Sequence, residues 1–173
     1  MDWGGFEQAA PELAAQVRRA FARFGFALVA TIRRDGTPRL SPVEWHCVGG
    51  HLMLVMIPHT RKVHDLDRDS RVLVQTPVTE SEAPEDEAAL RGRVHDISDT
   101  AHRGATAAAI EASSGWRPRD SWRYFAVDIE SASCKHWDGE DMRLLRWDEA
   151  GGARPPQRLR LDMTAGRYRP TLP

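Results

Sequence analysis

The chain has 173 residues, of which 41% are hydrophobic and 28% are charged, and these values are ordinary for one globular domain with a sizeable core. A net charge of −1 and a pI of about 6.7 exclude a global field that would favour nucleic acid or an anionic membrane. No window approaches the roughly 18 apolar residues of a membrane span, and the N-terminus lacks a signal-peptide pattern, so we expect a cytoplasmic protein.

Residues 1–25 predict a helix that packs on the rest of the fold. Pro11 suits the first helical turn, and Gly25 suits the C-terminal cap. Between them, apolar residues recur at helical spacing and form one stripe, which predicts core packing. The stripe consists of Leu13, Val17, Phe21 and Phe24.

Three strands joined by two tight turns are predicted next. Residues 26–33 are apolar and β-branched, and the Asp-Gly pair at 35–36 predicts a hairpin turn. Residues 39–48 alternate, and the Gly-Gly pair at 49–50 predicts a second turn. Residues 51–57 form a nearly continuous apolar run, which indicates a strand buried on both faces. The pattern predicts an antiparallel meander.

Two further strands, at 71–78 and 89–97, flank an acidic segment at 79–88. That segment contains proline and lacks apolar periodicity, so it predicts a solvated loop whose charge needs no partner. Gly92 lies inside the second of these strands. It predicts a bulge or the close approach of another backbone.

An alanine-rich helix is predicted from a cap at Ser98 or Asp99 to Gly115. Strands at 122–137 and 142–147 follow, joined by a tight turn. This helix and these two strands are the last elements with a clear apolar periodicity.

These elements predict a mainly β fold with flanking helices. Six to seven mostly antiparallel strands with short connections favour a split β-barrel, formed by residues 26–150 as a single domain. Residues 151–173 are rich in Gly, Pro and Arg, so we expect a tail that is partly disordered or lies on a partner subunit. Cys47 and Cys134 have no CxxC spacing and predict small core side chains.

Seven histidines invite interpretation as metal ligands, but their spacing argues against it. There is no HExxH motif, and His59 and His64 share no helix face well. The stretch from Asp65 imitates a calcium loop, but Ser70 stands where glycine is required and Thr76 where glutamate is required. We therefore predict no metal site. The histidines are at positions 46, 51, 59, 64, 95, 102 and 136.

The stretch IPHTRKVHDLDRDSRV, residues 57–72, predicts a short helix with unusual charges. Thr60 suits the N-cap, so the helix begins at Arg61 and runs to about Arg68. Arg61 and Lys62 then lie in the first turn, where the helix dipole already leaves partial positive charge. Cations at that end destabilise an exposed helix by about 0.3–1 kcal/mol each.

A bound anion would explain these cations. Free backbone N–H groups, the helix dipole and the side chains of Arg61 and Lys62 would converge on one phosphate. Arg39 and Ser41 lie two residues apart on a predicted strand, so they share a face of it. The meander could bring that face alongside the loop that follows residues 51–57. The alternative is that the two cations pair with acidic side chains of the helix itself: Asp65, Asp67 or Asp69.

The order of these pieces resembles a known family. A strand-turn-strand of the type ALVATIRRDGTPRLSPVEW, an apolar strand and then TRKVHDLDRDSRVLV resemble the flavin-binding split barrels of the pyridoxamine 5′-phosphate oxidase-like family. The resemblance runs from about Phe26 to Trp147; ALRGRV matches a later strand, and HWDGEDMRLLRW matches the segment near the family's C-terminus. It implies an FMN-binding homodimer with two flavin sites in the subunit interface.

The resemblance also implies the cofactor-binding residues. The phosphate and the isoalloxazine would be lined by Arg39, Ser41 and Val43, and backbone contacts to the ring would come from Val55, Met56 and Ile57. The phosphate would be held by Thr60, Arg61 and Lys62. The ring or the ribityl chain would be flanked by Trp137.

Two positions depart from the family pattern. Near the start of the strand after the acidic segment, the authentic oxidase contacts the cofactor with a side-chain amide, whereas this chain has the carboxylate of Glu87. The arginine that the family has in its last strand falls near Arg146 or Trp147. Because the substrate-recognition segments of the authentic oxidase have no match, we do not predict pyridoxamine phosphate as the substrate.

We predict a flavin-dependent oxidoreductase with a small-molecule substrate and no catalytic side chain, since the flavin carries the hydride chemistry. One alternative is a reductase that uses the deazaflavin coenzyme F-420, with Arg61, Lys62 and the arginine-rich tail forming a basic groove. The other is a non-catalytic flavin or haem binding protein, for which the histidines offer axial ligands.

Overall fold

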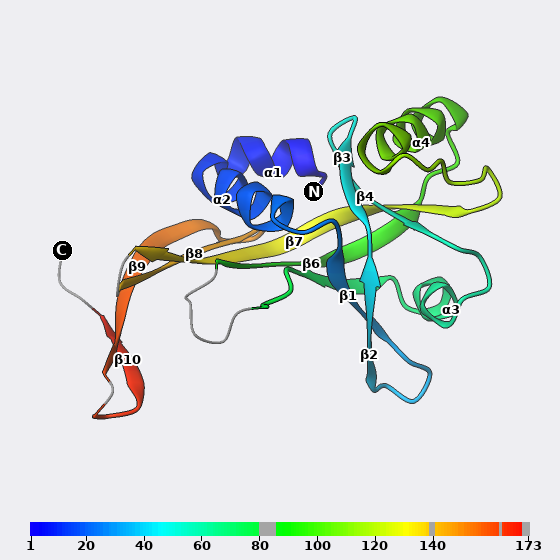
Figure 1. Cartoon of the computed structure of the whole chain (residues 1–173). Helices are drawn as coiled ribbons and strands as arrows, with labels where there is room; N and C mark the ends of the chain where they lie inside the picture. Colours follow the sequence, from blue (N-terminus) through cyan, green and yellow to red (C-terminus); the bar gives the residue numbers. More distant parts are fainter. Residues whose placement is uncertain (80–85, 139–140, 163, 171–173) are drawn as a thin grey trace.

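The computed structural model in Figure 1 describes residues 1–79, 86–138, 141–162 and 164–170, apart from the side chains at 138, 156, 158 and 161. Four helices and ten strands lie within these ranges. The helices are α1 (Trp3–Ala9), α2 (Pro11–Ala22), α3 (Arg61–Arg68) and α4 (Thr100–Ser114). The strands are β1 (Ala27–Ile32), β2 (Pro38–Val43), β3 (Trp45–Val48), β4 (His51–Met56), β5 (Arg71–Gln75), β6 (Glu87–Asp96), β7 (Arg123–Asp138), β8 (Asp141–Asp148), β9 (Gly152–Asp162) and β10 (Arg167–Pro170).

All the strand pairs are antiparallel, which confirms the predicted mainly β split barrel. The main path runs β10-β9-β8-β7-β6-β5-β1-β2, while β4 pairs with β3 and β7. The described strands outnumber the six or seven predicted, for two reasons. The chain bends at Glu44 and divides one predicted strand into β2 and β3, and the supposed tail forms β9 and β10.

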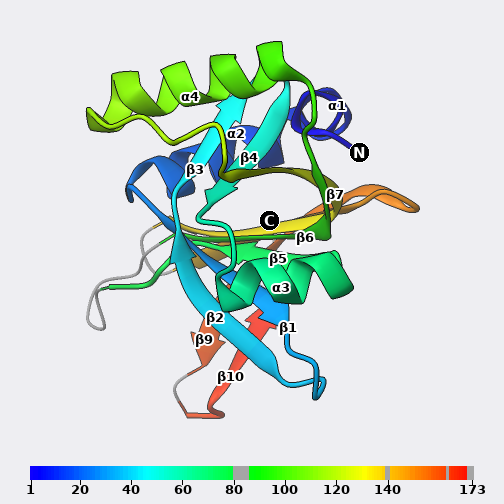
Figure 2. The same cartoon turned by 90° about the vertical axis from the view of Figure 1, so that its right-hand side faces the viewer.

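The predicted three-strand meander is present, but its middle strand is divided. The first half of that strand, β2, pairs with β1, and the second half, β3, pairs with β4, whose other edge pairs with β7. The bend at Glu44 carries the β3–β4 hairpin away from the edge of β2. The barrel is therefore split between β2 on one side and β3 and β4 on the other (Figure 2).

The N-terminal region contains one helix that the sequence pattern did not predict. The Asp2 carboxylate accepts a hydrogen bond of 2.8 Å from the Gly5 N–H and caps α1, and Trp3 and Phe6 are buried. The second helix begins at Pro11 as predicted, but it ends at Ala22 with Arg23 as its C-cap, so Gly25 is not the cap. Its stripe is buried, except that Phe24 is only half-buried.

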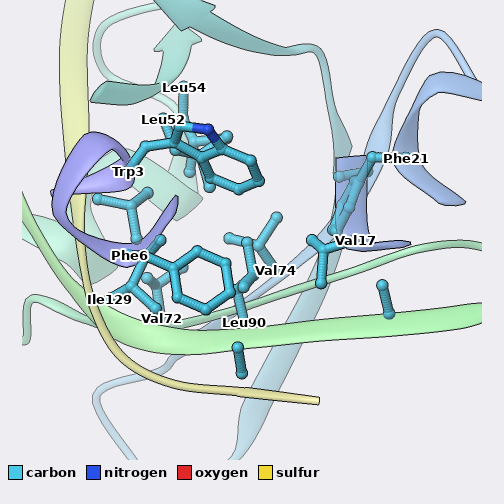
Figure 3. Close-up of a cluster of buried hydrophobic side chains, with 14 of the residues drawn as sticks. Trp3, Phe6, Val17, Phe21, Leu52, Leu54, Val72, Val74, Leu90 and Ile129 are labelled. Atoms are coloured by element: carbon cyan, nitrogen blue, oxygen red, sulfur yellow. The ribbon is translucent and has the colours of Figure 1, made fainter. Parts of the chain in front are cut away.

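The main core lies between α1, α2 and the concave face of the sheet. Figure 3 shows Trp3 and Phe6 from α1 meeting Leu52 and Leu54 from β4, with Ile129 from β7 beside them. A smaller cluster lies on the other face of β4 and β7, where α4 covers Met53, Tyr124 and Ala126. These two clusters confirm that β4 is buried on both faces.

Gly92 confirms both predictions made for it. The register of β6 against β7 shifts between Arg91 and Gly92, which is a bulge. A Cβ placed at Gly92 would lie 1.9 Å from the carbonyl oxygen of Asp128. Only glycine fits where the backbones of β6 and β7 approach each other so closely.

Other local predictions have mixed outcomes. Asp99 caps α4 by accepting from the His102 N–H, and Gly115 ends it at φ 78°, as predicted. The acidic segment falls largely outside the described residues, but β6 already begins at Glu87 within its predicted range. The prediction that its charge needs no partner is wrong for Asp86 and Glu87, which pair with His136 and Lys135. Cys47 and Cys134 are free thiols, and burial raises the pKa of each to about 12. No described helix is long and apolar enough to cross a membrane.

Candidate functional site

The predicted phosphate helix is present with its predicted bounds, Arg61–Arg68, and Thr60 is its N-cap residue in an extended conformation. The predicted capping bond is absent, however. The Thr60 hydroxyl donates backwards to the Ile57 carbonyl oxygen at 3.0 Å, and no described side chain caps the first turn of α3. The amides of that turn therefore remain available to a ligand.

The two first-turn cations have no partner among the residues that the structure describes. Neither Arg61, which is exposed, nor Lys62, which is half-buried, makes an ion pair or a hydrogen bond with any residue that the structure describes. Burial lowers the pKa of Lys62, because no neighbouring carboxylate compensates its charge. Both side chains are free to meet an anion.

The alternative of pairing within the helix is wrong, because every carboxylate of the helix region is occupied elsewhere. Asp65 is bonded to Arg39 and Thr31, and it lies 3.7 Å from the guanidinium of Arg68. The other two carboxylates form ion pairs with residues outside the helix: Asp67 with Arg123 at 2.8 Å, and Asp69 with Arg71 at 2.6 Å.

Arg39 is fixed against α3 by Asp65. Its Nε donates to Asp65 Oδ2 at 2.6 Å, and the Thr31 hydroxyl donates to the same oxygen at 3.0 Å. Burial alone would raise the pKa of Asp65, but these two hydrogen bonds outweigh burial and hold the pKa below its ordinary value. The other guanidinium N–H groups of Arg39 keep their donor capacity.

The predicted face of β2 is confirmed. Arg39 and Ser41 are half-buried and Val43 is buried, while the residues between them are exposed, Leu40 to 61%. Arg39 stands opposite Thr31 on β1, and Ser41 opposite Val29. This face therefore continues the side of the sheet on which α3 lies.

The end of β4 offers its backbone. Val55 packs beneath α4, Met56 is buried in the main core, and Ile57 is 52% exposed. β3 pairs with β4 only as far as Leu54, so from Val55 onward no described strand pairs with the edge of β4 away from β7. This edge lies at the split in the barrel, and the Ile57 carbonyl oxygen there already accepts from the Thr60 hydroxyl.

A strained turn links β4 to α3. His59 adopts φ 62°, the left-handed region that non-glycine residues rarely enter. This conformation lies in the turn between Met56 and α3, across which the Thr60 hydroxyl donates to the Ile57 carbonyl oxygen. His59 and His64 are both exposed, with ring centres 6.3 Å apart.

Trp137 is not brought to this site within one chain. α3 is bound to the first residue of β7, Arg123, through Asp67. Trp137 lies 14 residues further along the same strand, about 45 Å at about 3.3 Å per residue, at the opposite end of the sheet (Figure 1). Glu87 and Arg146 lie in that same far region, where they bond to Lys135 and Gln157.

The sequence interpretation missed the roles of Asp65 and Thr31. Asp65 was considered as a partner for the first-turn cations and as the start of a calcium loop, although it stands among the buried residues of α3, next to Val63 and Leu66. A carboxylate on the buried side of a short helix signals a fixed cation, but the sequence does not show that this cation is Arg39, 26 positions away. In the described ranges, no group of three or more His, Cys, Asp or Glu is arranged to hold a metal ion.

One known family matches most of this sequence. The sequence profile described as pyridoxamine 5′-phosphate oxidase matches residues 13–137. The chain belongs to the pyridoxamine 5′-phosphate oxidase-like family. No curated protein matches it in sequence. Members of this family commonly bind flavin, and they include enzymes.

Solved structures share the fold at low identity. A conserved hypothetical protein from Mycobacterium tuberculosis is 16% identical, with a TM-score of 0.59 over 72% of this chain and 83% of its own. PhzG from Burkholderia lata, in complex with tetrahydrophenazine-1-carboxylic acid, is 12% identical, with a TM-score of 0.59 over 91% and 93%. A heme binding protein from Mycobacterium smegmatis is 14% identical, with a TM-score of 0.57 over 85% and 87%. At these identities the likeness concerns the fold alone.

Proposed function

We propose that this protein is an FMN-binding oxidoreductase that acts on a small molecule as a homodimer. The observation that carries the proposal is the first turn of α3. Two cations stand there without a partner in the described ranges, beside uncapped amides, while the three nearby carboxylates are bonded to other residues. A phosphate monoester would satisfy the amides and neutralise both cations at once.

The residues fit FMN in three ways. Arg61 and Lys62 would hold its phosphate, and Arg39, oriented by Asp65, would add further N–H donors. Ser41 and Val43 would continue along the ligand on the same face of β2. The open edge of β4 from Val55 to Ile57 would give its backbone to the polar rim of the ring. FMN bound there would supply hydride and electron transfer.

A second copy would complete the site. Leu40 and Ile57 are large apolar side chains exposed beside it, by 61% and 52%. A cavity of about 270 Å³ lies on the outer face of β1 and β5, lined by half-buried residues that include Ala30, Ile32 and Leu73. A partner covering this apolar face would remove it from water. We place Trp137 in the site of the partner, since it is remote from its own α3.

The absorbance spectrum of the purified protein tests the cofactor. We expect flavin absorbance, retained through dialysis, and elution as a dimer in size-exclusion chromatography. Lys62→Glu should weaken FMN binding by about a hundredfold or more, because it replaces a charge-assisted contact with repulsion. Arg154→Ala removes an exposed arginine paired with Asp148, and it should change FMN binding little. A Lys62→Glu protein that stays yellow after dialysis would disprove the phosphate assignment.

The same spectrum distinguishes the alternatives. The fold shared with a heme binding protein keeps haem as a second candidate, and an intense Soret band would indicate it. The deazaflavin coenzyme F-420 absorbs at shorter wavelength than FMN. Its basic groove would need the arginine-rich tail, but β9 and β10 lie at the far end of the sheet from α3 (Figure 1). Only a second copy could supply those arginines.

A further inference from the structure

Helix α3 is held on both sides of the split in the barrel. On the side of β1 and β2 it is held by Asp65, which is bonded to Thr31 and Arg39. On the side of β4 and β7 it is held by Asp67, which lies 2.8 Å from Arg123 at the start of β7. Within the described ranges, no other side chain of α3 forms an ion pair or a hydrogen bond with β4, β6 or β7. Arg123 therefore makes the polar contact that fixes α3 on that side.

The guanidinium of Arg123 is itself fixed by its neighbours. Its Nη1 lies 2.8 Å from Asp67 Oδ1, and its Nε donates to Asp96 Oδ2, at the end of β6, at 2.7 Å. It also lies over the ring of Phe125, with 4.8 Å between the guanidinium carbon and the ring centre. A planar guanidinium holds two carboxylates in set directions, whereas an ammonium group acts as a point charge. Arg123 therefore fixes where α3 lies relative to β6 and β7.

Arg123 also belongs to the strand pair that carries the proposed ring site. It stands opposite Met56 in the pairing of β7 with β4. Met56 is the middle residue of the β4 edge whose backbone would contact the flavin ring. The side chain of Arg123 holds the helix whose first turn would bind the phosphate. One residue therefore links the two ends of the proposed cofactor site, although it lies outside both sets of binding residues.

The spacing between these two ends matters, because one molecule has to reach both. Riboflavin has the ring without the phosphate, whereas FMN joins the two through a ribityl chain. Joining two binding groups increases affinity only where the geometry lets both bind at once. We propose that Arg123 is a positioning residue, which sets the distance between the phosphate site and the ring site without touching the cofactor. This proposal rests on the proposed FMN function.

Arg123→Met tests the proposal, because methionine removes both ion pairs but keeps an unbranched side chain that can cover Phe125. Flavin fluorescence measures FMN and riboflavin binding to the full chain freed of cofactor, and competition with FMN measures the binding of inorganic phosphate. The wild type should bind FMN at least about a hundredfold more tightly than riboflavin. In Arg123→Met this preference should fall at least about tenfold, while the affinities for riboflavin and for phosphate each stay within about twofold.

The outcomes separate this proposal from the function on which it rests. If the wild type shows no preference for FMN over riboflavin, the phosphate assignment fails and this proposal fails with it. If the wild type has the preference and Arg123→Met keeps it, this proposal alone fails. It also fails if the variant loses affinity for FMN, riboflavin and phosphate alike, because a merely structural role would have that effect.

Two further variants complete the test. Arg143→Met is the matched control, because the Arg143 side chain is 30% exposed, compared with 28% for Arg123, and it ties α2 to β8 through Glu12. Its preference for FMN should equal that of the wild type. If Arg123→Met does not fold, Asp67→Asn breaks the same link at an exposed ion pair, which contributes little to stability. An unchanged preference in Asp67→Asn would then overturn the proposal.

Discussion

The first turn of α3 and the far half of β7 both carry many charges, but only one of them neutralises those charges internally. In the far half, Lys135 is paired with Glu87 and His136 with Asp86, each at 2.9 Å. In the first turn of α3, Arg61 and Lys62 have no partner in the described part of the chain. Paired charges stabilise the fold by themselves, whereas unpaired cations at a helix start lower its stability until an anion binds.

The contrast exists even within α3. At the C-terminal end, Arg68 donates to the Ile32 carbonyl oxygen and lies near Asp65, an arrangement that suits the helix dipole. At the N-terminal end, two cations oppose the dipole. Helix stability therefore explains why Arg68 stands at the C-terminal end, and the proposed ligand explains why Arg61 and Lys62 stand at the N-terminal end.

The largest expected effect comes from removing the carboxylate of Asp65, which joins α3 to β1 and β2. Asp65→Ala should lower the free energy of unfolding by about 3 kcal/mol, because it leaves the charge of Arg39, 19% exposed, without its partner. Chemical denaturation measures this. Asp67→Ala, on the exposed side of the same helix, should cost less than about 1 kcal/mol. Equal losses would show that Asp65 does not fix Arg39.

The pH dependence of Asp65→Ala sharpens this test. The pKa of Asp65 is lowered from 3.8 in the folded state, so its contribution is fully present above that ordinary value. The contribution is lost as the pH falls through the lower, folded-state pKa. The stability difference between the wild type and Asp65→Ala should therefore be constant near neutral pH and shrink below about pH 4.

A smaller effect is expected at the strained turn before α3. His59→Gly should raise the free energy of unfolding by about 0.5 kcal/mol, since relief of the positive φ exceeds the added entropy of the unfolded chain. The same change should weaken cofactor binding by loosening the turn. His64→Gly, inside α3, should instead lower stability by about 1 kcal/mol. Thermal denaturation of both variants measures the two signs; a loss at His59 would contradict strain there.

The smallest effect compares the only two lysines of the sequence. In cofactor-free protein, Lys62→Met should leave stability unchanged or raise it by about 0.3 kcal/mol, because a half-buried unpaired charge is removed. Lys135→Met should lower stability by about 0.5 kcal/mol, because the ion pair with Glu87 is lost. Urea unfolding measures both. A stability loss at Lys62 larger than that at Lys135 would show that Lys62 has a structural role.

Sequence reasoning predicted the elements whose signals are local. The bounds of α3, the caps of α4 and the close approach at Gly92 follow from residues within one turn or one strand. Helix α1 was missed because two glycines in WGGFEQA weaken its intrinsic propensity, and burial of Trp3 and Phe6 against the sheet stabilises it instead. β9 was missed because prolines and arginines obscure its alternation, and pairing with β8 forms it.

The candidate site was predictable only in part. The helix-terminal cations could be read directly from Arg61 and Lys62, and the shared face of β2 from the two-residue spacing of Arg39 and Ser41. The bond from Arg39 to Asp65 could not be predicted, because it depends on how α3 packs on β1. The strand that ends near Trp137 was predicted, but the sequence does not show that α3 is bound to the opposite end of this strand, at Arg123.

The contact at Gly92 limits how the barrel can vary. The Asp128 carbonyl oxygen occupies the space that any side chain at position 92 would need. The two strands are paired on both sides of this bulge, and Ile129, the partner of Gly92, lies near the middle of β7. Any side chain at position 92 would therefore have to move the two strands apart between the end of β7 that α3 contacts and the end that carries Trp137.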